Sequence, residues 1–131
     1  MFVDDLIRWF HLLAAAVWIG GMIVVASIVP ALRKSGAERR HLQAAARRFG
    51  AVAWVALTLS AVTGVLQLYR LQIEVRGNTT LMVKLLLVGL AVGVAFTHQE
   101  LARDATPAVR GAMEGILLLI GLGILTAAVA L

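Results

Sequence analysis

The chain has 131 residues, of which 61% are hydrophobic and 15% are charged, with a formal net charge of +5 and a mean hydropathy of +0.93. Ordinary soluble domains are about 45–50% apolar and about 25% charged, and a fold this small has too much surface to hide so much hydrocarbon. The composition therefore argues against a soluble enzyme, a disordered chain and a nucleic-acid-binding module. The chain has no cysteine, which excludes disulfides, thiolate metal sites and cysteine nucleophiles.

Four segments are apolar enough, and about long enough, to cross a bilayer core of about 30 Å, which takes roughly 20 residues of helix. They are residues 6–30, 50–69, 81–98 and 111–131. The third and fourth carry one charge each, Lys84 and Glu114, and the second carries none. Core helices of a soluble bundle show a polar face, which these segments mostly lack. The sequence thus predicts one all-α membrane domain over residues 1–131, an up-down-up-down four-helix bundle in contact with lipid.

Lysine and arginine in the short loops predict the orientation of the spans. Eight of them lie in loops 31–49 and 98–110, whereas the opposite side has Arg8, Arg70 and Arg76. We therefore expect a multi-pass protein of a prokaryotic-type inner (plasma) membrane with both termini outside. The basic loop 31–49 is expected to contact anionic lipid rather than nucleic acid, and its residues 36–48 could form a short helix on the membrane surface.

Glycine pairs at a spacing of four occur in the last two spans, at Gly89 and Gly93 and at Gly111 and Gly115. Such pairs allow membrane helices to approach closely. We expect them to serve packing within the chain, with a homodimer seam as the alternative.

Three polar side chains lie at a similar depth in the predicted outer half of the membrane. His11 lies about 7 Å inside the first span and Lys84 about 5 Å inside the third, while Gln67 lies near the outer end of the second. Ionisable groups in hydrocarbon are costly, so each is a candidate functional residue. They can converge only if all three helices turn these side chains toward the bundle interior.

Helical spacing predicts which faces line that interior. The expected stripes are His11, Ala14, Ala15, Trp18, Met22 and Val25 on the first span, Ser60, Thr63, Gly64 and Gln67 on the second, and Lys84, Val88, Ala91 and Ala95 on the third. The small residues in these stripes leave room beside His11 and Lys84 for a ligand other than lipid.

A neutral imidazole binds copper, zinc or haem iron, and a thioether suits copper(I). His11 and Met22 are therefore candidate metal ligands, although Met22 lies about three turns deeper. A cofactor would be held by His11, Lys84, Trp18 and Gln67. The spacing leaves copper and haem b open. No hydrolase triad, carboxylate pair or phosphate loop predicts a catalytic residue, so an enzyme of this sequence would use a bound redox cofactor.

Structural explanations stand beside these functional ones. Lys84 could extend its amine to the outer interface, and His11 could be a hydrogen-bonded interface residue. In that case the chain would be an accessory membrane protein without a ligand. His41, His98, Glu100 and Glu114 could form a cytoplasmic metal or proton site, but solvated helix ends are the favoured explanation, with Glu114 at a helix N-terminus.

The stretch from Arg8 to Gly21, with its histidine, a tryptophan seven residues later and a glycine pair, resembles the opening helix of the copper resistance D (CopD) family. Residues 47–49 before a helix containing residues 62–65, and residues 81–88 around Lys84, extend the resemblance over nearly the whole chain. It implies an inner-membrane helical bundle for copper uptake or resistance, with His11 and Lys84 as functional residues and Trp18 shaping the pocket.

The same two motifs also look like those of HemJ-type protoporphyrinogen oxidases, which likewise have a histidine followed by tryptophan at seven residues and a lysine opening a later helix. That more distant resemblance implies haem b, with His11 and Lys84 as axial ligands. The function would then be electron transfer or porphyrinogen oxidation.

Overall fold

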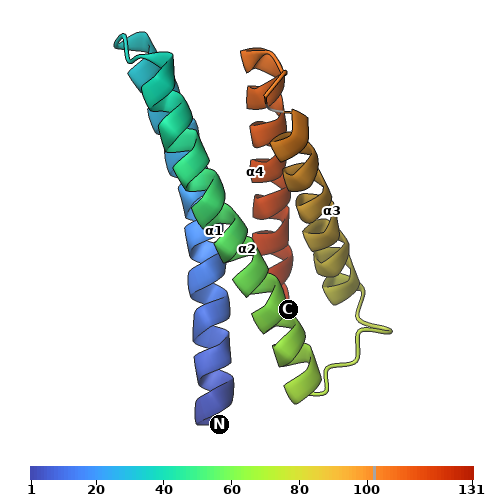
Figure 1. Ribbon diagram of the computed structural model, residues 1–131. Helices are drawn as coiled ribbons and strands as arrows, with labels where there is room; N and C mark the ends of the chain where they lie inside the picture. Colours follow the sequence, from blue (N-terminus) through green and yellow to red (C-terminus); the bar gives the residue numbers. More distant parts are fainter. Residues whose placement is uncertain (102) are drawn as a thin grey trace. The chain divides into compact units, whose positions relative to one another are not determined.

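The computed structural model describes residues 1–101 and 103–131 and consists of four helices (Figure 1). They are α1 (Phe2–Lys34), α2 (Arg39–Arg70), α3 (Thr79–Leu101) and α4 (Pro107–Val129). Each is long and apolar enough to cross a membrane, and the described residues contain no strand. The predicted fold class, an all-α membrane protein of four helices, is confirmed.

The chain divides into two compact units, Met1–Ile73 and Glu74–Leu131. The first is a hairpin of α1 and α2, and the second is a hairpin of α3 and α4. Contacts in both units join early residues of one helix to late residues of the other, so each pair is antiparallel. Asp4 meets Arg70 in the first unit, and His98 meets Glu114 in the second.

Local backbone chemistry sets the helix ends. At the end of α1, Gly36 has a φ of +89°, and Ala37 N–H donates to the Leu32 carbonyl at 3.0 Å. Glycine adopts this left-handed conformation without steric cost, so it closes the turn to α2. The start of α4 has Pro107 in its first turn, and Thr106 Oγ1 accepts from Val109 N–H at 3.3 Å.

Two helices begin earlier than the apolar segments predict. Residues 39–48 are the first turns of α2 rather than a separate surface helix, because nothing between Arg39 and Arg70 breaks the helix. The capped start of α4 at Pro107 likewise places Glu114 in the third turn, so the expectation that it lies at a helix N-terminus is wrong.

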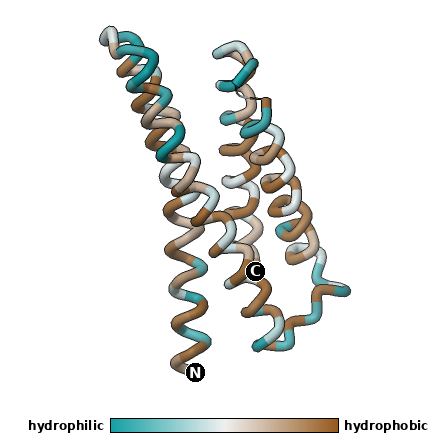
Figure 2. Tube along the Cα trace, in the orientation of Figure 1, coloured by the Kyte–Doolittle hydropathy of each residue, from teal (hydrophilic) through white to brown (hydrophobic). Residues whose placement is uncertain are grey.

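Cross-contacts fix the register of the first hairpin. From one end to the other, Asp4 lies beside Arg70, His11 beside Ser60, and Gly21 against the ring of Phe49. With 33 and 32 residues, α1 and α2 are about 50 Å long, well beyond a bilayer core of about 30 Å. Figure 2 shows hydrophilic residues concentrated where the two helices meet their connecting turn.

The buried side chains form narrow stripes, and the rest of each helix surface is apolar and exposed. Ala14, Trp18 and Met22 are buried on α1, and Ala91 is fully buried on α3. Ile23, Val24, Ile28 and other large apolar residues are about half exposed. An apolar exterior of this kind suits a lipid environment, and the stripes agree with those that helical spacing predicts.

Close helix approach does not use the paired glycines. A Cβ atom added to Gly89, Gly93, Gly111 or Gly115 would meet nothing within 4 Å among the described residues, so these four glycines do not mediate close contact between α3 and α4 inside their hairpin. The tight positions are Gly21 and Gly64 in the first hairpin and Gly123 in the second, where the added atom would meet Leu87 Cδ1 at 3.3 Å.

Candidate metal or cofactor site around His11

The centre of the site is the half-buried imidazole of His11, which α1 directs onto α2. His11 Nδ1 lies 2.8 Å from the Ser60 carbonyl oxygen and 3.1 Å from Thr63 Oγ1. A carbonyl oxygen only accepts hydrogen bonds, so Nδ1 must carry the proton and donate it. In the neutral imidazole the lone pair therefore resides on Nε2, the nitrogen able to ligate a metal.

Thr63 holds this arrangement in place. Its side chain is 5% exposed, the only buried polar side chain among the described residues, and its hydroxyl donates to the Leu59 carbonyl at 2.6 Å. Because the hydroxyl proton is donated to Leu59, Oγ1 offers a lone pair to His11. The Nδ1–H group therefore donates to both Thr63 Oγ1 and the Ser60 carbonyl. The imidazole is thus fixed in ring orientation and in tautomer.

Gly64 provides the space for the ring. A Cβ atom at this position would lie 3.2 Å from His11 Cε1 and 3.6 Å from Nδ1, tighter than ordinary contact. The glycine therefore allows the imidazole to rest against the backbone of α2 and to reach the Ser60 carbonyl.

We expect Gly64→Ala to push the ring a few tenths of an ångström away and to weaken the bond to Ser60. The expected loss is about 1 kcal/mol of unfolding free energy, measured by thermal unfolding in detergent, with an upfield shift of the Nδ1 proton resonance. Gly20→Ala is the matched control, because its Cβ meets nothing within 4 Å among the described residues. Equal behaviour of the two variants would contradict the role of Gly64.

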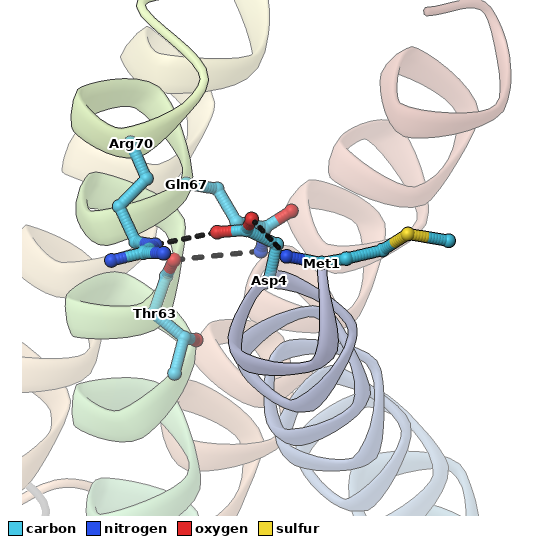
Figure 3. Close-up of polar contacts among 5 residues, drawn as sticks. All are labelled: Met1, Asp4, Thr63, Gln67 and Arg70. Carbon is cyan, nitrogen blue, oxygen red and sulfur yellow. Dashed lines mark hydrogen bonds and ion pairs between the residues drawn. The ribbon is translucent and has the colours of Figure 1, made fainter.

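Gln67 lies one turn after Thr63, toward the end of α2 that lies beside the N-terminus. Its Nε2 donates to the Thr63 carbonyl at 3.4 Å (Figure 3). Near it, Arg70 Nε contacts Asp4 Oδ1 at 2.5 Å, and the terminal amine lies 3.3 Å from Asp4 Oδ2. A cavity of about 150 Å³ opens at this end, lined by Asp4, Asp5, Ile7, Arg8, Gln67 and Leu71. The site thus has a polar rim at the end of the hairpin where both helices are charged.

Trp18 and Met22 follow His11 along the buried stripe of α1, with 5% and 9% of their surface exposed. At 1.5 Å per residue they lie about 10 and 16 Å along the axis from His11. One ion cannot contact both His11 and Met22, so Met22 can only be a separate position. Trp18 lies between them on the same buried face of α1.

Lys84 belongs to the second unit, where it is half-buried on the α3 stripe that includes Ala91. The described residues offer its ammonium no hydrogen bond or ion pair. The structure thus joins His11 to Ser60, Thr63 and Gly64 within one hairpin, and convergence with Lys84 stays a prediction. Among the described residues, no group of three or more histidine, cysteine, aspartate or glutamate side chains is placed to hold a metal ion.

Two contacts of the site were not predicted from the sequence. The Ser60 carbonyl carries no sequence signal, because every residue has a carbonyl. The ion pair between Asp4 and Arg70 did have a sequence signal, because these two residues flank the outer ends of the first two predicted spans.

Fold and site together define a multi-pass membrane protein with a tautomer-fixed histidine between its first two helices. Comparison with family models, with curated proteins and with solved structures gives no match to this chain.

Proposed function

We propose that this protein handles copper in the inner membrane, as the resemblance to the CopD family implies, with His11 as its ligand in the outer half of the bundle. The supporting observation is the bond from Nδ1 to the Ser60 carbonyl. Metal-ligating histidines almost always donate their other ring N–H to a carbonyl or carboxylate, which fixes the tautomer and raises the basicity of the ligating nitrogen.

Met22 would provide a second copper position on the same stripe. Its thioether suits copper(I), and its sulfur lies in a largely buried environment about three turns from His11. Two separated positions favour stepwise movement of an ion along the α1–α2 seam over a single closed site. With both termini outside, His11 would be reached first from the outer side, past the cavity at Asp4 and Gln67.

Haem b is the second candidate, and a specific observation favours it. Among the described residues, no group of three or more histidine, cysteine, aspartate or glutamate side chains is placed to hold a bare ion. Haem iron receives four ligands from its own ring, so His11 alone, or with Lys84, would suffice. Bound haem would supply electron-transfer chemistry.

The deciding experiment is a visible spectrum and a copper analysis of protein purified in detergent from cells given both copper and haem precursor. One or two equivalents of copper with a featureless spectrum support copper handling. A Soret band with sharp reduced-state bands supports haem b and overturns the copper proposal. Absence of both would overturn both proposals and leave an accessory membrane role.

A further inference from the structure

The second hairpin carries its own imidazole–carboxylate pair, in which His98 of α3 faces Glu114 of α4. His98 Nε2 lies 3.7 Å from Glu114 Oε1. This nitrogen is buried, and it has no hydrogen-bond partner among the described residues. A buried, unpaired ring nitrogen is costly, and in native proteins an ordered water or an ion commonly accounts for such an atom.

The separation of the two atoms indicates what fits between them. Hydrogen bonds from nitrogen to oxygen span about 2.7–3.2 Å, so 3.7 Å is too long for a direct bond. Two ligands of one tetrahedral zinc ion, each about 2.0–2.2 Å from the metal, lie roughly 3.3–3.5 Å apart. The gap therefore matches a shared metal ion more closely than a shared proton.

A contact elsewhere in the hairpin shows how closely its two helices pack. Leu87 Cδ1 lies close to the backbone of Gly123, which keeps α3 and α4 near each other. The antiparallel register then places His98 opposite Glu114, about three turns farther along α3 from Leu87. The side chains are 24% and 50% exposed, so water can reach the carboxylate from one side while the imidazole nitrogen remains covered.

We propose that His98 and Glu114 form a binding site for a divalent cation of the zinc type. An imidazole and a carboxylate are among the ligands that zinc accepts in proteins, and water would complete the coordination. Neither ligand is a thiolate or thioether, so copper(I) is disfavoured here. The site lies in the second unit and is independent of His11, whatever that residue binds. An ion there would join α3 to α4.

The test is titration of the detergent-purified, chelator-treated protein with Zn²⁺, monitored by calorimetry and by thermal unfolding. We expect about one equivalent to bind and to raise the unfolding midpoint. His98→Ala and Glu114→Gln should each weaken binding by at least about tenfold. Glu100→Gln and His41→Ala are the matched controls, because Glu100 neighbours the site in sequence and His41 is an exposed histidine elsewhere. Both controls should bind zinc as the unchanged protein does.

Nitrogen-15 NMR of histidine-labelled protein provides a second reading, which reports on the imidazole nitrogen itself. Zinc should shift one Nε2 resonance, and that resonance should be the one missing in His98→Ala. The proposal is overturned if the protein binds no zinc up to millimolar concentration. It is also overturned if Glu114→Gln binds zinc unchanged, or if His98 is doubly protonated and insensitive to zinc.

Discussion

His11→Ala is expected to abolish metal or haem loading, with affinity falling by more than about 100-fold. Loss of groups that merely orient a ligating histidine costs about 10–100-fold, and this substitution removes the ligating nitrogen itself. The measurement is copper or haem bound per mole of purified protein. His41→Ala is the matched control, since that imidazole is exposed on α2, and it should load normally.

Thr63→Val separates positioning from ligation at the same site. Valine has the shape of threonine but lacks the hydroxyl that accepts from His11 Nδ1 at 3.1 Å. The Ser60 carbonyl remains, so loading affinity should fall by about tenfold rather than be lost.

If His11→Ala loads as the unchanged protein does, His11 is only a packing residue and both proposals for its site are wrong.

A membrane-impermeant maleimide is expected to label Glu74→Cys in intact spheroplasts and to label Ser35→Cys only after the membrane is opened. The chain has no cysteine of its own, so neither variant carries background. Both residues are exposed and lie between helices, Ser35 after α1 and Glu74 before α3. The expected contrast is close to all or none, because an intact bilayer excludes the charged reagent.

The six basic residues around Ser35 are the reason for this expectation, since cytoplasmic loops retain lysine and arginine. They are Arg33, Lys34, Arg39, Arg40, Arg47 and Arg48. The reverse labelling pattern would place the termini inside and His11 in the inner half of the membrane. The geometry around His11 would be unaffected, but the direction of proposed copper movement would reverse.

Composition and helical periodicity by themselves determined the class and the inward faces of this protein. Hydrocarbon has no water to form hydrogen bonds with backbone N–H and C=O groups, so long apolar segments must be helical. The number of apolar segments long enough to cross a membrane then gives the number of helices. Periodicity likewise identified Ala14, Trp18 and Met22 as one buried stripe. Helix starts were predicted less well, because α2 and α4 begin before their apolar segments. Nothing in residues 39–49 breaks the helix of α2, and Thr106 with Pro107 sets the start of α4.

Only the tertiary structure decided what these faces touch. The tautomer of His11 depends on a carbonyl 49 residues away, and the ring is admitted because position 64 lacks a side chain. The pairing of His98 with Glu114 depends on the register of α3 against α4, which shifts with where each helix begins. The sequence identified the inward residues, because the face on which a residue lies depends only on its own helix. Contacts between helices depend on side-chain shapes on both, and periodicity carries no information about them.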